Sequence, residues 1–192
     1  MSAETTWVLL RVAGIVALAA LTISVASGLA GPAVRAPAWR GVLVSVHRAS
    51  ALLGLSLTLG HVVLAVVDPW VEVSAAAAVV PGASTWEPMW VGVGAVAVDL
   101  LVVVAVTSAL RSRGPRAWWT AHVLTYPAWL LATGHALAIG TDAWRTPYLG
   151  AGAVGALLVA AAAAARARAA RRGYPAGVPP QKPTAVPTGA TR

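Results

Sequence analysis

The residues of this chain whose types and spacing could do chemistry are its four histidines, His47, His61, His122 and His135. They fall in pairs on two apolar segments, each long enough to cross a lipid bilayer as a helix. An imidazole inside hydrocarbon is costly unless it faces the protein interior and has a partner. Four of them on two segments therefore predict a functional site, and the partner that suits a neutral imidazole best is a metal ion.

The composition is that of an integral membrane protein. Of the 192 residues, 58% are hydrophobic and 10% are charged, whereas an ordinary soluble domain has about 25% charged residues. Cysteine is absent, which excludes disulfides, thiolate metal sites, iron–sulfur clusters and a cysteine nucleophile. The net charge of +8 is better explained by membrane topology than by nucleic acid, and we expect no nucleic-acid partner.

The apolar segments predict an all-α fold, a polytopic transmembrane helix bundle of about five spans. Each segment has roughly 19 to 27 residues, near or above the ~20 that cross a bilayer as a helix. We place the spans at residues 7–30, 41–67, 89–110, 117–139 and 147–165. The longest loop, 68–88, contains the apolar run 73–80, which is too short to cross and predicts a cap over one end of the bundle.

The basic residues predict how the bundle is oriented. Twelve of them fall on one side of the predicted membrane, namely Arg35, Arg40, Arg48, Arg111, Arg113, Arg116, Arg166, Arg168, Arg171, Arg172, Lys182 and Arg192. Because loops rich in Lys and Arg stay in the cytoplasm, we expect the N-terminus outside and the C-terminus inside. Residues 173–192, rich in Pro, Gly and Thr, are predicted to be a disordered cytoplasmic tail.

Depth in the membrane predicts which histidines meet. The spans 41–67 and 117–139 both run from inside to outside, so His47 pairs with His122 near the cytoplasmic end and His61 with His135 near the outer end. Separations of 14 and 13 residues put the two levels about 21 and 20 Å apart. That leaves room for two stacked macrocycles, and two neutral imidazoles on opposite faces suit a six-coordinate electron-transfer haem. We therefore predict two b-type haems.

Helix geometry fits one of the two spans better than the other. A separation of fourteen residues rotates an α-helix about 40° less than four full turns, so His47 and His61 share a face. The separation of thirteen residues between His122 and His135 rotates it about 140° less, so these two would not share a face on a straight helix. The second span must deviate from a straight helix, and Pro127 between its histidines predicts a kink that supplies the rotation. Gly60 and Gly134, each just before a histidine, would let a flat ring approach the backbone.

Two arginines are candidates for contacts with the haem propionates. Arg48 directly follows His47 and is placed for the inner haem. Arg11 enters the membrane from the outer end of the first span and meets either a propionate of the outer haem or Asp99, which sits about halfway along the third span. If Arg11 and Asp99 form a buried pair, substitutions of the two residues should not be additive.

Other interpretations of the histidines stay open. They could be core residues bonded to Ser, Thr or carbonyl groups across helices, or, with Asp99, a proton relay of a transporter or channel. A non-haem metal is disfavoured because the predicted pairs lie ~20 Å apart and no carboxylate lies at either level of these spans.

The pattern around the histidines resembles the ferric reductase-like transmembrane domain family. The residues that carry the resemblance are His47-Arg-Ala-Ser, Gly60-His61, Trp118, His122, Leu124, Tyr126, Trp129, His135 and Gly140-Thr-Asp142. The family includes ferric reductases, NADPH oxidases and the haem-binding membrane subunit of bacterial methionine sulfoxide reductase systems. The resemblance covers roughly residues 7–165 and implies that the four histidines are the haem ligands. We accordingly predict that residues 1–172 form a haem-binding transmembrane domain.

The histidines and the resemblance together predict a diheme b-type cytochrome of the plasma membrane that carries electrons across the bilayer. We expect no FAD or NAD(P)H site in the chain, so its redox partner is a separate flavoprotein or a quinone. A quinol-linked cytochrome b subunit is the alternative. Electrons are predicted to enter at the cytoplasmic haem and to leave at the outer one.

Overall fold

The structure, a computed structural model, describes residues 2–71, 73–140 and 145–172 and is helical apart from its connecting loops. Its elements are α1 (Ala3–Ala30), the short 3₁₀ helix η1 (Gly31–Ala33), α2 (Pro37–Val67), α3 (Pro88–Ala109), α4 (Pro115–His122), α5 (Thr125–Ile139) and α6 (Thr146–Arg171). The predicted all-α bundle is thus confirmed. The predicted tail, 173–192, lies outside the described residues.

Local sequence sets where the helices begin. The side chain of Ser2 caps α1 by accepting a hydrogen bond from the backbone N–H of Thr5 at 3.2 Å. Pro37, Pro88 and Pro115 open α2, α3 and α4, because the first turn needs no N–H donor and proline already holds a helical φ.

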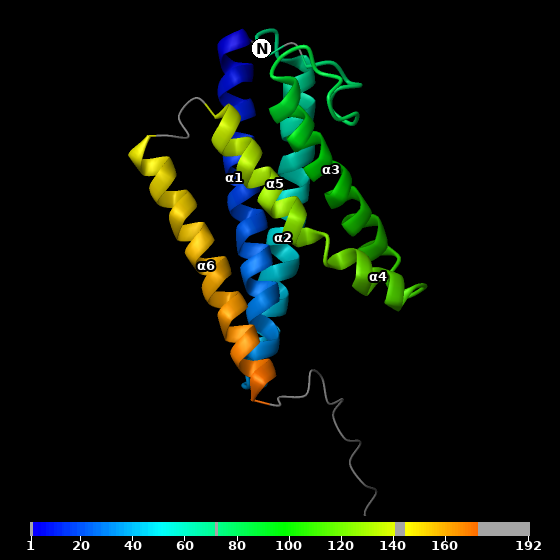
Figure 1. The fold of residues 1–192 in the computed structure, drawn as a ribbon, viewed down its shortest axis with the longest axis vertical. Helices are drawn as coiled ribbons and strands as arrows, with labels where there is room; N and C mark the ends of the chain where they lie inside the picture. The colour runs from blue at the N-terminus through cyan, green and yellow to red at the C-terminus, as the bar shows by residue number, and fades with distance from the viewer. Residues whose placement is uncertain (1, 72, 141–144, 173–192) are drawn as a thin grey trace, which may run out of the picture.

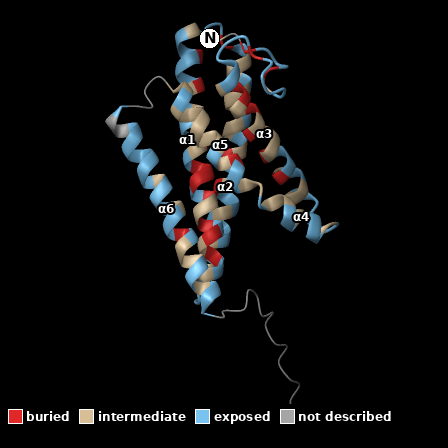
Figure 2. Cartoon of the chain, viewed as in Figure 1, coloured by how far each residue is buried: buried red, intermediate tan, exposed pale blue. Residues whose placement is uncertain are grey.

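Helix α1 is the centre of the bundle. It packs antiparallel against α2 along its length, and α5 and α6 pack on other sides of it, while α3 packs against α4 and α5 (Figure 1). Buried residues gather on the sides of the helices that face one another, and the outward sides are exposed (Figure 2). These exposed sides carry large apolar residues such as Leu52, Leu59 and Leu157, as expected for surfaces in contact with lipid.

Four described helices are long and apolar enough to cross a membrane, α1 with η1, α2, α3 and most of α6. The fourth predicted span, 117–139, is not one straight helix, in line with the deviation predicted between its two histidines. It is divided into α4 and α5, with the break at Val123 and Leu124. Pro127 explains the break, because it lacks the N–H that would bond the carbonyl of Val123 and its ring clashes with that carbonyl.

The long loop between α2 and α3 packs on the end of the bundle where the N-terminus lies (Figure 1). Val73 and Ala77 are buried against Val91 of α3, with Ile139 of α5 beside them. The loop approaches α3 so closely that a Cβ on Gly92 would lie 3.0 Å from the backbone nitrogen of Gly82. This arrangement confirms the predicted cap.

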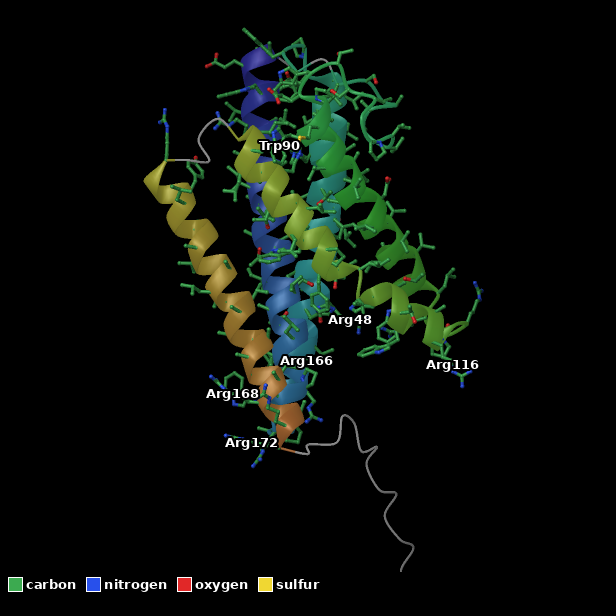
Figure 3. The ribbon with its side chains drawn as sticks, in the orientation of Figure 1. Arg48, Trp90, Arg116, Arg166, Arg168 and Arg172 are labelled. Atoms are coloured by element: carbon green, nitrogen blue, oxygen red, sulfur yellow. The ribbon has the colours of Figure 1, made fainter. Side chains whose placement is uncertain are left out.

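The basic residues gather at the opposite end of the bundle. Arg116, Arg166, Arg168 and Arg172 all lie at the end away from the N-terminus (Figure 3). The sequence had placed them on one side, and the fold brings them to one end.

Candidate functional site

The fold brings the four histidines together in the two predicted pairs. The ring centroids of His61 on α2 and His135 on α5 lie 6.3 Å apart with the ring planes at 87°. Those of His47 on α2 and His122 at the end of α4 lie 6.0 Å apart at 70°. We call His61 and His135 the upper pair, since it lies toward the N-terminal end of α1, and His47 and His122 the lower pair.

The spacing of each pair fits one metal ion held between two imidazoles. A metal–imidazole bond is about 2.0 Å, and the ring centre lies about 1.1 Å behind its nitrogen, so two imidazoles on opposite sides of one metal have centroids about 6.2 Å apart. The observed 6.3 and 6.0 Å are close to this value. Two axial nitrogens are the protein ligands that a six-coordinate haem requires.

Three of the four histidines donate their Nδ1–H to a backbone carbonyl of a neighbouring helix. The bonds join His61 to Leu10 at 2.9 Å, His47 to Ser24 at 2.9 Å and His135 to Trp90 at 2.8 Å. A carbonyl only accepts, so the proton of each ring is on Nδ1 and Nε2 keeps a free lone pair for a metal. Bonds across helices were also expected of ordinary core histidines, but here they leave the Nε2 of each of these rings available as a ligand.

A glycine lies behind each of these three rings. A Cβ on Gly14 would lie 2.9 Å from the ring of His61, one on Gly28 3.1 Å from that of His47, and one on Gly94 2.6 Å from that of His135. Each glycine follows the accepting carbonyl by four residues, one helical turn. We call each combination of a carbonyl and the glycine one turn later a histidine cradle.

Sequence reasoning missed these glycines. The signal that could have found them is their spacing, because Gly14 and Gly28 are 14 residues apart, as are His47 and His61. Two antiparallel helices with matching 14-residue repeats can place both pairs of positions face to face. At Gly60, where the sequence predicts that a flat ring approaches the backbone, an added Cβ would meet no atom within 4 Å.

The family follows from a match over most of these elements. A family model described as the ferric reductase like transmembrane component matches residues 13–133. This chain belongs to that family. No curated protein and no solved structure matches it. Membership places the chain among the membrane components of oxidoreductases, and transmembrane domains of this family generally bind haem.

The matched region of this ferric reductase-like chain contains all three cradle glycines and three of the four histidines, and it ends two residues before His135. Among the described residues, no three His, Cys, Asp or Glu side chains gather as a possible metal site. Each histidine pair therefore offers two candidate ligands, with no third such side chain beside it in the described part of the chain.

His122 is held differently from the other three histidines. Its Nδ1 is buried and has no hydrogen-bond partner among the described residues. Its ring instead lies 5.2 Å from the ring of Trp118, one turn earlier on α4. The Trp118 indole N–H donates to the hydroxyl of Ser108 on α3 at 3.2 Å. His122 is therefore supported by a ring contact rather than by a cradle.

An apolar layer separates the two pairs in this ferric reductase-like bundle. Leu21, Leu101 and Ala128 form its buried centre. Trp129 packs against them and donates its indole N–H to the hydroxyl of Thr22 at 2.9 Å. A cavity of about 60 Å³ lies between this layer and the lower pair. The layer excludes water from the middle of the bundle.

The two candidate arginines lie near different pairs. Arg11 follows Leu10, which accepts the bond of the upper pair, and its guanidinium lies 4.3 Å from the ring centre of Trp7. Arg48 is exposed beside His47 in the lower half of the bundle (Figure 3). Asp99 is half-buried on α3, and its coupling with Arg11 stays a prediction.

Proposed function

We propose that this ferric reductase-like chain is a membrane-embedded diheme b-type cytochrome that carries electrons across the bilayer as a subunit of an oxidoreductase. The observation that carries the proposal is the presence of two histidine pairs, each joining two helices, with the ring separation of two imidazoles on one haem iron. Haem iron, when bound, supplies one-electron redox chemistry. The candidate ligands are His61 with His135 and His47 with His122.

The chain's own residues bind and orient. The cradle carbonyls fix the tautomer and the angle of three histidines, which keeps Nε2 directed at the site. Residues 47 and 61 lie 14 apart on the continuous helix α2, so the two levels are about 21 Å apart. The apolar layer between them keeps water and ions from crossing with the electron. Arg11 and Arg48 are the candidate partners of the propionates.

The arginine-rich end of the bundle supports a cytoplasmic C-terminus in the plasma membrane. A basic face suits docking of an acidic flavoprotein, so electrons enter at the lower haem from a separate flavoprotein or a quinone and leave at the upper one. The direction is tested in proteoliposomes of known orientation with an impermeant reductant on one side. Fast transfer from the outer side inward, with the reverse slow, would refute it.

The haem assignment is tested by absorption spectra and haem analysis of the purified protein. We expect two haems per chain with low-spin bis-histidine spectra. His135→Ala should remove or alter the upper haem alone, and His47→Ala the lower haem alone. Thr133→Ala, on the same helix as His135 but outside both pairs, is the control and should keep both haems. A colourless protein would refute the proposal and favour the proton-relay alternative.

A further inference from the structure

The fourth histidine has no cradle, and α3 carries a serine where the cradle pattern would place a glycine. Helix α1 repeats its cradle after 14 residues, and the same repeat on α3 would lead from Gly94 to residue 108. Residue 108 is a serine, and its hydroxyl accepts the indole N–H of Trp118. The Nδ1 of His122 has no hydrogen-bond partner among the described residues, so the carbonyl of Val104, one turn before Ser108, does not serve it.

The element that carries His122 is also the least anchored of the helices that carry a ligand. Helix α4 has eight residues, none of them buried, and it is separated from α5 by the break at Val123 and Leu124. A short exposed helix beside a break can shift without unfolding the bundle. His47, the opposite ligand, lies inside the 31-residue helix α2 and keeps its cradle.

We propose that His122 is an exchangeable axial ligand, so that the lower haem, unlike the upper one, accepts a small diatomic iron ligand in its place. This rests on the proposed function, because it requires a haem at the lower pair. In the exchange, the bond from iron to Nε2 of His122 breaks and a bond from iron to the incoming ligand forms, with no change in the electron count. A ligating histidine that lacks its second hydrogen bond is a weaker base and binds metal about 10- to 100-fold less tightly.

Trp118 is the positioning residue of this ligand. Its ring contacts the ring of His122, and its N–H bond to Ser108 ties α4 to α3. Loss of that bond should free α4 and speed the exchange. The neighbouring Trp119 is 57% exposed and offers a matched substitution of the same residue type one position away.

Carbon monoxide is the probe, added to the purified full-length chain after reduction with dithionite and followed by visible absorption. We expect one of the two haems to respond, at a rate that stops rising at high carbon monoxide because release of His122 limits it. In His122→Ala, the same haem should respond at a rate proportional to carbon monoxide. A response of neither haem or of both, or unchanged kinetics in His122→Ala, would overturn the inference. A protein without haem would instead refute the proposed function.

Substitution of the tryptophans then tests the positioning. Trp118→Phe keeps an aromatic ring but removes the bond to Ser108, and we expect exchange about 10-fold faster. Trp119→Phe should change the rate by less than about 2-fold, since the Trp119 ring contacts that of Trp118 at 5.7 Å, Phe keeps an aromatic ring there, and the bond to Ser108 is untouched. The unchanged spectrum of the upper haem reports that each variant is folded. Equal rates in the two variants would refute the role of Trp118.

A second, independent inference concerns a basic pocket at the lower end of the bundle. A pocket of about 230 Å³ lies between η1 and the end of α6, and it is lined by Ala33, Arg35, Ala165, Arg168, Ala169 and Arg172. The lining residues thus bring three guanidinium groups and no carboxylate to the pocket. Arginine forks bind phosphate oxygens particularly well.

We propose that this pocket binds the phosphate headgroup of an anionic phospholipid. The shared chemistry is a phosphate, but a lipid is favoured because the alanines give the pocket an apolar wall and it lies where an apolar helix ends, at headgroup level. Figure 3 shows Arg168 and Arg172 at this end, with Arg166 on the same helix. Arg166 and Arg171 do not line the pocket and so provide a control of equal charge.

The test measures lipid retained by the purified full-length chain, by native mass spectrometry, after exposure to vesicles of phosphatidylglycerol or phosphatidylcholine. Arg168→Gln with Arg172→Gln should reduce phosphatidylglycerol retention about 10-fold or more. Arg166→Gln with Arg171→Gln should reduce it less than about 3-fold, although the same charge is lost. Equal losses of phosphatidylglycerol retention in the two double variants would overturn the inference. So would equal retention of phosphatidylglycerol and phosphatidylcholine by the unsubstituted chain. Displacement of the lipid by millimolar inorganic phosphate would assign the pocket to the free anion instead.

Discussion

His135 of the upper pair and His122 of the lower pair come from the same predicted span and face the same helix, α2, yet the bundle holds them by different means. His135 has a carbonyl and a glycine of α3 behind its ring, whereas His122 has an indole ring and an unbonded Nδ1. The ring separations of the two pairs are nonetheless nearly equal. The distance between two ligands thus does not reveal how firmly each one is held.

Helix length explains the difference. Helix α1 has 28 residues and carries two cradles, one for each level. Helix α3 has 22 residues and ends at Ala109, so the level of the lower pair falls at its last turn. At this level α3 carries Ser108 in place of a glycine, and the hydroxyl of that serine is bonded to Trp118. The upper pair therefore has two cradles and the lower pair one.

Among the substitutions expected to affect one histidine pair and not the other, Gly94→Ala should have the largest effect. Its Cβ would lie 2.6 Å from Nδ1 of His135, closer than atoms can approach, and both groups belong to packed helices. The ring must move, and we expect the upper haem to be lost, so that haem content falls from about two per chain to about one. Haem analysis and absorption spectra measure this.

Gly152→Ala is the control for Gly94→Ala. Gly152 is an exposed helical glycine, and an added Cβ meets no atom within 4 Å. Both haems should stay in this variant. If Gly94→Ala also kept both haems, the cradle would have no part in holding His135.

Pro127→Ala is expected to act on the lower pair instead. It restores the missing N–H, and a continuous helix through 117–139 would turn His122 about 140° away from the direction of His135. We expect the lower haem to lose a ligand while the upper haem keeps its spectrum. Pro115→Ala, at the first turn of α4, removes a proline without closing the break and should change neither haem.

The sequence predicted the fold and the pairs well, for physical reasons. Apolar length gives the spans, and depth within them gives the partners of His47 and His61. The 140° mismatch also pointed to a deviation near Pro127, which the structure places one turn earlier. What the sequence could not give is the contact between helices. Gly14 and Gly94 are two of 18 glycines, and nothing in their own segments shows that a histidine lies against them.

A smaller effect is expected from Gly28→Ala on the lower pair. Its Cβ would lie 3.1 Å from Nδ1 of His47, a contact that a shift of a few tenths of an ångström can relieve. We expect the lower haem to stay bound but to be lost faster on dilution, by about 10-fold, as for other changes to the groups that hold a metal ligand in place. Gly14→Ala, at 2.9 Å from the ring of His61, should weaken the upper haem more than this. The reverse order would mean that the contact distances do not rank the cradles.

The smallest effects should come from substitution of the two arginines. Each substitution should change the reduction potential of one haem through loss of a charge, without a change in its ligands. Removal of a positive charge near a haem disfavours the reduced state, so Arg11→Gln should lower the potential of the upper haem and Arg48→Gln that of the lower haem. Each change should be about 1 kcal/mol or less, or about 40 mV for one electron, because both side chains are at least partly solvated. Redox titration of the two haems measures the shifts. If Arg11 pairs with Asp99 rather than with a propionate, Asp99→Asn should be better tolerated in an Arg11→Gln background than alone, because the double variant leaves neither charge buried without its partner. Equal shifts of both haems in either single variant would contradict the assignment of one arginine to each pair.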